Sequence, residues 1–342
     1  MKNSIFKNKN ILVAGATGTI GIPLVKKLQS LNSNITAVAL DDLNNANNLL
    51  GKDIKYLKLD LRDYEKCEDA TKNQDYVFNL TGIKGNVGIG FSKAASYFVP
   101  MILCQTNLME ASFRANVSRY LFVSSICAYP RSEIHHEENM WNGLPLQNDK
   151  YPGLVKRIGE IQAETYLHEY DWDAVRIVRP SNVYGPYDDF NSLTAQVIPA
   201  LIGRVLNNED PLNVWGDGTA RRDFIFSEDL VDGLLLSLEK SPSCFPVNLG
   251  SGKAISIKEI VKIICDVTSK SPEIIWDTSR PSGDLIRKLD VSRSENLLNF
   301  KPKTSLIDGI KKTVDWYMNN KYLAKNKSDV LSKLNDKRHG DL

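Results

Sequence analysis

The stretch "NILVAGATGTIGIP", residues 10–23, contains the signal that decides the fold. Its apolar start predicts a buried β-strand, and the helical spacing of Ile20, Leu24 and Leu28 predicts a helix immediately after it. Three glycines lie between the two elements: Gly15, Gly18 and Gly21. Glycine allows a tight turn, close approach of the backbone to a pyrophosphate, and close packing of helix on strand. Because a helix N-terminus offers N–H groups to phosphate, this arrangement predicts a dinucleotide-binding site.

Short apolar runs alternate with longer helical patterns through the first half of the chain. The runs that predict strands are residues 10–16, 35–40, 54–59, 76–80, 119–125 and 174–180. They are apolar almost throughout, which is typical of strands covered on both faces. We therefore expect an α/β fold, a Rossmann-type doubly wound parallel sheet with a smaller C-terminal α/β substrate-binding lobe.

The texture of the sequence changes after about residue 180, where loops rich in Gly, Pro, Asp and Asn separate short helical patterns. We expect the dinucleotide-binding domain to span residues 1–180 and to receive a further segment at about 220–250. Residues 181–219 and 251–322 would form the substrate-binding lobe. Residues 323–342 are polar and are expected to be a frayed tail.

Composition excludes several classes of protein. Lysine and arginine total 43 against 41 acidic residues, so a net charge of +2 predicts no basic face and no nucleic-acid partner. The start of the chain resembles neither a signal peptide nor a membrane span. Five scattered cysteines without CxxC spacing favour a reducing cytoplasm, with no disulfide and no metal site.

Two aspartates end the second predicted strand, about twenty residues after the last glycine of the loop. A carboxylate at Asp41 or Asp42 would accept hydrogen bonds from the adenosine ribose and repel a 2′-phosphate. No arginine stands beside the pair to receive such a phosphate, so NAD is predicted rather than NADP. Asp60, after the third strand, would contact the adenine or lie on the surface.

A series of motifs carries a resemblance to a known family. In chain order they are "GATGTIG", "VFNLTG", "SSICAYP", "KRIGE", "RPSNVYGP", "GDGTARRDFIFSEDL" and "RPSGDLIRKLD", which cover about residues 10–320. In these motifs the chain resembles the extended short-chain dehydrogenase/reductase family of NAD-dependent nucleotide-sugar epimerases and dehydratases, and within it the GDP-fucose synthase and GDP-mannose 3,5-epimerase branches. The cofactor contacts that we expect are Gly15, Thr17, Gly18, Thr19, Ile20, Gly21, Asp41, Asp60, Leu61, Leu80 and Lys156.

The resemblance implies a catalytic serine, lysine and tyrosine, of which this chain keeps two. Ser125 matches the serine that hydrogen-bonds the C4 oxygen of the sugar, and Lys156 matches the lysine that holds the nicotinamide ribose. The tyrosine position, four residues before the lysine, is Pro152. Pro152 is expected to begin the helix, with Tyr151 on an irregular approach. Tyr151 then either swings towards the nicotinamide as acid/base or packs as an aromatic lid.

A cysteine offers a second route to proton transfer. Cys127 lies two residues before Tyr129, where the two related branches carry a cysteine base that moves protons beside a C4 ketone. A thiolate of lowered pKa would suffice for this step, and the alternative is a small space-filling cysteine. The histidine that donates a proton in GDP-fucose synthase is matched by Gln196, which cannot act as an acid. His135 and His136 could supply a proton, although solvent-exposed positions are expected for both.

The resemblance also implies how a nucleotide sugar is held. The substrate-binding residues that match are Asn182, Arg204, Arg222 and Arg287. Arginine suits a diphosphate because its planar fork pairs with two oxygens.

The leading hypothesis is an NAD-dependent epimerase that acts on a nucleotide sugar, expected to be GDP-linked, through or beside a C4 ketone, in polysaccharide biosynthesis. The alternative within the enzymes is a C4 dehydrogenase/reductase of a GDP-hexose or GDP-heptose. A non-catalytic NAD-binding sensor or scaffold is the rival of another class. The apolar helices predicted at 99–115 and 153–170 resemble those that pair relatives into a four-helix bundle, so a cytoplasmic homodimer is expected.

Overall fold

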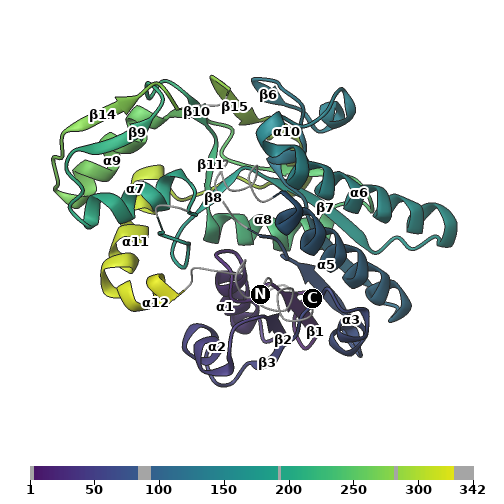
Figure 1. Cartoon of the computed structure of the whole chain (residues 1–342). Coiled ribbons are helices and arrows are strands. Elements are labelled where there is room, and N and C mark those ends of the chain that lie inside the picture. Colours follow the sequence, from purple (N-terminus) through teal and green to yellow (C-terminus); the bar gives the residue numbers. More distant parts are fainter. Residues whose placement is uncertain (1–3, 84–93, 192–193, 281–283, 327–342) are drawn as a thin grey trace, which may run out of the picture.

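The computed structural model describes residues 4–83, 94–191, 194–280 and 284–326 (Figure 1). A seven-stranded sheet forms its centre, in the order β12-β7-β5-β4-β1-β2-β3, with every neighbouring pair parallel. The strands are β1 (Asn10–Ala14), β2 (Asn34–Ala39), β3 (Lys55–Lys58), β4 (Tyr76–Asn79), β5 (Arg119–Val123), β7 (Val175–Pro180) and β12 (Val247–Leu249). The predicted Rossmann-type sheet is therefore confirmed, with β12 added from far along the chain.

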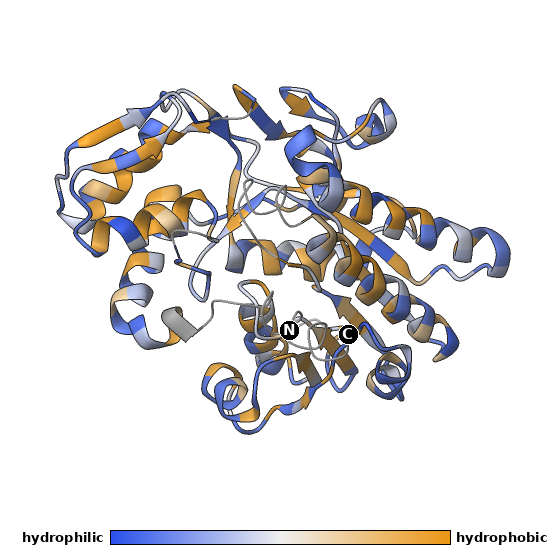
Figure 2. Cartoon of the chain, in the orientation of Figure 1, coloured by the Kyte–Doolittle hydropathy of each residue, from blue (hydrophilic) through white to orange (hydrophobic). Residues whose placement is uncertain are grey.

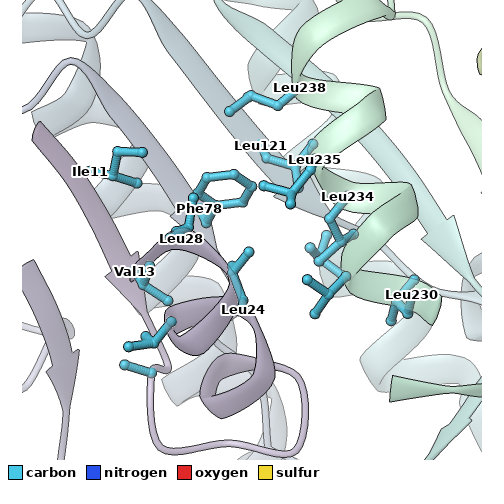
Figure 3. Packing of buried hydrophobic residues seen from close by; sticks show 14 of the residues in the cluster. Ile11, Val13, Leu24, Leu28, Phe78, Leu121, Leu230, Leu234, Leu235 and Leu238 are labelled. Carbon is cyan, nitrogen blue, oxygen red and sulfur yellow. The ribbon is translucent and has the colours of Figure 1, made fainter. Parts of the chain in front are cut away.

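Helices cover both faces of this sheet. They are α1 (Gly21–Ser30), α2 (Leu43–Leu50), α3 (Tyr64–Thr71), α5 (Ala94–Arg114), α6 (Lys150–Tyr170) and α8 (Ser227–Lys240). Alternate residues of β1 face opposite ways, since Ile11 and Val13 pack with α1 and α8, whereas Leu12 packs with α3, α5 and α6. Figure 3 shows the first of these cores, with Leu24 and Leu28 of α1 opposite Leu234 of α8. Burial on two faces explains why the strands read as continuous apolar runs.

A second, smaller region lies beside the carboxyl ends of the strands. Its strands are β6 (Ile134–His135), β8 (Asn182–Tyr184), β9 (Leu212–Trp215), β10 (Arg221–Arg222), β11 (Phe224–Phe226), β13 (Ile255–Ser256), β14 (Ile274–Asp277) and β15 (Ile286–Leu289). Its helices are α7 (Val197–Leu206), α9 (Ile257–Thr268), α11 (Leu306–Asn319) and α12 (Lys321–Asn326), whereas α10 (Ser292–Leu298) packs through Leu298 on the core of the central sheet. Figure 2 shows the hydrophobic residues of α7 and α9, which form a separate core with Ile310 and Val314 of α11.

The strands of this smaller region pair in three short sheets. β10 pairs with β15 and β13, and β15 pairs with β6, while β8 pairs with β11 and β9 with β14. The first four residues of the predicted polar tail lie in α12, and the rest of that tail, 327–342, lies outside the described residues. No described helix is long and apolar enough to cross a membrane. The described residues hold no cluster of metal-ligating side chains.

Candidate active site

The glycine loop adopts a geometry that only glycine satisfies. Gly15 has φ +81°, and a Cβ on it would lie 2.9 Å from the Leu80 carbonyl oxygen. A Cβ on Gly21 would lie 2.3 Å from the Gly15 carbonyl oxygen. In the described chain, Ile20 begins α1 without a side-chain cap, and the first turn of that helix has no acidic residue. These residues fit the pyrophosphate of a dinucleotide, because uncapped N–H groups and an absence of negative charge favour an anion.

Asp41 lies where a ribose-binding carboxylate is predicted. Thr17 Oγ1 donates to Asp41 Oδ2 (2.6 Å), and Asn45 Nδ2 donates to Asp41 Oδ1 (2.8 Å). The neighbouring Asp42 caps α2 by accepting from Asn45 N (2.8 Å). The glycine loop and the start of α2 therefore fix the direction of the Asp41 carboxylate.

The remaining predicted cofactor residues border the same edge of the sheet. Asp60 accepts from both Nε and Nη2 of Arg62, the latter at 2.6 Å. Leu61 is buried in the core on the α3 side of the sheet. Thr19 Oγ1 donates to Asp188 Oδ1 (3.3 Å), a buried carboxylate in the loop after β8. This loop therefore meets the start of α1.

Lys156 is buried under the carboxyl end of the sheet. Its Nζ donates to the Thr81 carbonyl (3.3 Å) and lies 5.3 Å from the centre of the Phe122 ring. Burial lowers the pKa of Lys156 to about 8. Ser125 follows β5, and its Oγ accepts from Cys127 N (3.1 Å), which caps the 3-10 helix Ile126–Ala128. A Cβ on Gly153 would lie 2.2 Å from the Cys127 carbonyl oxygen, so the start of α6 packs directly on the serine–cysteine loop.

The segment around the missing tyrosine differs from the prediction. Helix α6 begins at Lys150, two residues before Pro152, because the 3-10 helix Gln147–Asp149 leads into it. Tyr151 is therefore helical, and at 3.6 residues per turn it points about 140° away from Lys156. Its ring lies 5.9 Å from Lys150 Nζ, and its hydroxyl has no hydrogen bond among the described residues. An acid/base role for Tyr151 stays a prediction that this geometry does not favour.

Cys127 differs from the expected thiolate. Burial and, second, the negative charge of Asp149 raise the pKa of the Cys127 thiol to about 12, although Arg287 opposes the shift. The sulfur is therefore protonated at neutral pH. A role as base needs a further change in its surroundings, whereas a role as proton donor needs none.

Two of the predicted substrate arginines lie side by side. Arg222 of β10 and Arg287 of β15 are register partners, so their side chains share one face of the small sheet. Arg287 is also tied to the catalytic side: its Nη1 donates to Asp149 Oδ2 (2.5 Å) and its Nη2 to the Ile126 carbonyl (2.7 Å). Arg222 Nη1 donates to the Asp284 carbonyl (2.7 Å). Burial and the neighbouring Arg287 lower the pKa of Arg222, and an anion would relieve this repulsion.

The other two predicted substrate residues are placed differently. Asn182 Nδ2 donates to the Asp223 carbonyl (2.8 Å), directly beside Arg222 in sequence. Arg204, near the end of α7, pairs with the Glu209 carboxylate, which accepts from its Nε at 2.8 Å. Arg204 Nη2 also donates to the Asn213 carbonyl (2.5 Å). The structure thus groups Asn182 with Arg222 and Arg287, and gives Arg204 a local ion pair.

The expectation that both loop histidines are exposed is wrong for His135. His135 is 1% exposed because β6 pairs with β15, and its ring stacks on Tyr129 at 4.9 Å between centres. Neither ring nitrogen has a hydrogen-bond partner among the described residues. Burial, with Arg287 second, lowers the pKa of His135 to about 3, so the ring is neutral. His136 is half exposed, 3.8 Å from Asp290.

Sequence reasoning missed a buried ion pair that supports the site. Arg179 Nη2 donates to Glu160 Oε2 (2.6 Å), and Ser124 Oγ donates to Glu160 Oε1 (2.5 Å). Arg179 Nη1 also donates to the Tyr129 hydroxyl (2.9 Å). These bonds connect the ends of β5 and β7 to α6. Helical spacing offered a signal, because Glu160 follows Lys156 by four residues.

Asp149 and Asp223 were also missed. Asp149 precedes Lys156 by seven residues, which places the two on one helical face, and this spacing could have indicated it. Asp223 is fully buried and its carboxylate accepts from the backbone N–H groups of Ser251 (2.9 Å) and Gly252 (3.1 Å). Its four donors include Leu289 N (3.3 Å), which holds β15 in place. No local sequence signal announces that arrangement.

A cavity of about 790 Å³ lies at the opposite edge of the central sheet. Asn10, Asn34 and Lys55, at the amino ends of β1, β2 and β3, line it. Ligands of open parallel sheets bind at the carboxyl ends of the strands. We therefore place the active site at the glycine loop and Lys156, away from this cavity.

Comparison with known proteins identifies the family of this chain. Residues 11–250 match the model of the NAD dependent epimerase/dehydratase family. The chain belongs to that family. It is similar to the GDP-L-fucose synthase of Sinorhizobium fredii, with 29% identity over 92% of this chain and 98% of the relative. A dTDP-4-dehydro-6-deoxy-D-allose reductase of Streptomyces bikiniensis is 27% identical over 90% of this chain and 96% of the relative.

Among solved structures, the UDP-N-acetylglucosamine 4-epimerase of Methanobrevibacter ruminantium, in complex with UDP-N-acetylmuramic acid, matches with a TM-score of 0.80. It is 28% identical, over 92% of this chain and 99% of that one. The predicted family and its enzymatic character are thus confirmed: the chain is an extended short-chain dehydrogenase/reductase that uses a nicotinamide cofactor. It is an epimerase or reductase of a nucleotide-linked sugar.

Proposed function

We propose that this enzyme reduces the C4 ketone of a nucleotide-linked sugar, with GDP as the nucleotide and NADH as the reductant. The observation that carries the proposal is the pairing of a protonated Cys127 with a proline at the tyrosine position. Oxidation of a C4 alcohol needs a base, and so does removal of a ring proton. Reduction of a ketone needs an acid, which the Cys127 thiol supplies in its resting form.

The proton transfer has the required direction. A sugar alkoxide is strongly basic, and the buried Cys127 thiol, whose pKa is raised, holds a proton that it can donate. When bound, the nicotinamide supplies the hydride that reaches C4. Cys127 then gives its proton to the C4 oxygen, and the sulfur regains a proton from solvent after the product leaves. Ser125 would hydrogen-bond the same oxygen, and Lys156 would hold the nicotinamide ribose.

The substrate would be held through its diphosphate. Arg222 of β10 and Asn182 of β8 would contact it, and the repulsion between Arg222 and Arg287 favours an anion beside β10. We expect GDP because the chain is similar in full length to a GDP-L-fucose synthase. Arg204, already paired with Glu209, would contribute less than Arg222.

Inversion beside the C4 ketone is the second candidate. The full-length similarity to a GDP-L-fucose synthase and the position of Cys127 favour it. It requires Cys127 as a thiolate, which the Asp149 carboxylate opposes. A sensor without turnover is the third, and the retained Ser125 and Lys156 argue against it.

One experiment separates the three. The protein is incubated in deuterated water with NADH and a GDP-4-keto-6-deoxyhexose, and both NADH absorbance and ring deuterium are followed. Reduction consumes NADH and leaves the carbons beside C4 unlabelled. Inversion places deuterium beside C4 without a need for NADH, and a sensor gives neither result. Cys127→Ser should abolish the turnover that is seen, whereas Cys265→Ser, a control on α9, should keep it.

We also propose a homodimer through α5 and α6. The two helices run side by side in Figure 1 and are joined by the hydrogen bond from Gln162 Nε2 to the Thr106 carbonyl (3.0 Å). Leu103, Ile158 and Ile161 on their outer faces are 38–42% exposed. A second pair of helices would cover them in a four-helix bundle. A monomeric mass by gel filtration with light scattering would contradict this arrangement.

A further inference from the structure

Asp149 occupies an unusual position for a surface-loop carboxylate. It ends the 3-10 helix before α6, one turn before Pro152, and its side chain is only 15% exposed. Arg287 Nη1 donates to its Oδ2 at 2.5 Å. These two residues are 138 positions apart, so the pair joins the substrate lobe to the start of the catalytic helix.

The same arginine holds the catalytic loop. Arg287 Nη2 donates to the carbonyl of Ile126, the residue directly before Cys127. On the far side, Gly153 leaves room for the Cys127 carbonyl, and Ser125 Oγ accepts from Cys127 N. The cysteine backbone is therefore held from three directions: by β15 through Arg287, by α6 through Gly153, and by Ser125.

We propose that Asp149 and Arg287 are positioning residues for Cys127, because Arg287 bonds both the Asp149 carboxylate and the Ile126 carbonyl and so fixes a negative and a positive charge beside the cysteine loop. The inference rests on the proposed function only in giving Cys127 a catalytic task. The charged and titratable groups that act on the thiol are Asp149, Arg287 and Lys156, with Ser125 as a neutral hydrogen-bond partner. Arg287 thus serves the reacting centre through its hydrogen bonds to Asp149 and Ile126, and acts on the diphosphate only through its charge beside Arg222.

The sign of each charge gives a test that a purely structural role would fail. Removing a negative neighbour favours the thiolate, and removing a positive neighbour disfavours it. If the two residues only held the fold together, both variants would expose the thiol and speed its alkylation. Because Gly153 and Ser125 still hold the cysteine backbone in each variant, the lost charge decides the sign. Asp149→Asn and Arg287→Met should therefore change the reactivity of Cys127 in opposite directions.

The measurement is the rate at which iodoacetamide alkylates Cys127 in the full-length protein, followed by peptide mass spectrometry from pH 6 to 10. In Asp149→Asn we expect the rate profile to move about one unit lower, which is about tenfold faster alkylation at a fixed pH below the pKa. In Arg287→Met the rate should fall below that of the wild type. Cys265 is the internal control and should react equally in all three proteins. Glu209→Gln, which breaks the Arg204 ion pair instead, should leave Cys127 unchanged.

Opposite shifts support the proposal, and any other pattern overturns it. Circular dichroism establishes that the variants fold. If Asp149→Asn or Arg287→Met does not fold, the alkylation rates are measured in Asp149→Ser and Arg287→Gln instead. The assay needs neither sugar nor cofactor. If the alkylation rates do not shift in opposite directions, the positioning role is wrong and the proposed reaction is untouched. If they do shift in opposite directions but no keto sugar is turned over, the proposed reaction is wrong and the positioning role stands.

Discussion

The cofactor end and the substrate end of this molecule are both predicted to hold phosphates, yet they are built differently. At the glycine loop the backbone is predicted to bind the phosphates, because Gly15 and Gly21 leave no room for a side chain. At the substrate end the work falls to arginines, and Arg204 and Arg287 are already bonded to the protein's own carboxylates. A site made of backbone N–H groups is complete before its ligand binds. At a site made of side chains, the arginines can already be bonded to carboxylates of the protein. The difference teaches that a matched arginine is a weaker guide to a ligand than a matched glycine.

The largest effect is expected where the two ends meet, at Lys156. Lys156→Met should lower kcat for keto-sugar reduction about a hundredfold, because the nicotinamide ribose loses its anchor and the reacting atoms separate. Its thermal stability should not fall, since methionine buries without the desolvation that already lowers the lysine's pKa. Lys150→Met, on the same helix, is the control. Equal activity in the two variants would contradict the assignment of Lys156.

The backbone half of the comparison is tested at Gly21. Gly21→Ala forces a methyl group to within 2.3 Å of the Gly15 carbonyl oxygen. We expect a loss of about 1–3 kcal/mol in unfolding free energy and weaker NADH binding, by urea unfolding and fluorescence titration. Gln29→Ala, on the exposed side of the same helix, should change neither. Unaltered NADH affinity in a folded Gly21→Ala would break the claim that the backbone makes this site.

The enclosed character of the substrate end predicts acid sensitivity through His135. Its pKa is about 3 in the folded protein and about 6.5 when exposed, so only the unfolded state takes up a proton between these values. Stability from the neutral ring is therefore present above pH 6.5 and is lost as the pH falls. Between pH 6.5 and 5 the loss is about 2 kcal/mol. His135→Phe should flatten this decline in urea unfolding, and His136→Phe should not.

Arg222 and Arg204 differ in how they are bonded within the protein, so the two can be tested as a pair. Arg222→Gln should raise KM for the GDP-sugar about tenfold, the cost of one charged hydrogen bond to phosphate. Arg204→Gln should change KM less than threefold, because its guanidinium is bonded to Glu209 and Asn213. Steady-state kinetics with both variants decide the matter. A larger effect at Arg204 would restore it as a substrate residue.

The smallest effect concerns the choice of cofactor. Asp41→Ser removes the carboxylate that Thr17 and Asn45 orient. NADH should bind several-fold more weakly and NADPH more tightly, because a 2′-phosphate no longer meets a negative charge. Fluorescence titration of both cofactors measures the ratio. Asp42→Ser, which removes only the cap of α2, should leave the ratio unchanged.

The parts of the structure that were predictable depend on local sequence. The strands and the glycine loop follow from apolar runs and from residues within about ten positions of one another. The role of Arg287 and the burial of His135 depend on β15, a strand more than a hundred residues from β6, with which it pairs. Pairing of that kind has no periodic signature. The missing tyrosine was readable at once, but its consequence for Cys127 required the position of Asp149.

Different faces of helix α6 make several of the contacts described above. One side holds the nicotinamide lysine, another buries Glu160 against Arg179, Gly153 admits the carbonyl of Cys127, and Ile158 and Ile161 face outwards. An insertion of one residue just after Gly153 would turn every later position of the helix by about 100° relative to its start. Lys156, Glu160 and the outward-facing Ile158 and Ile161 would then leave their present positions together.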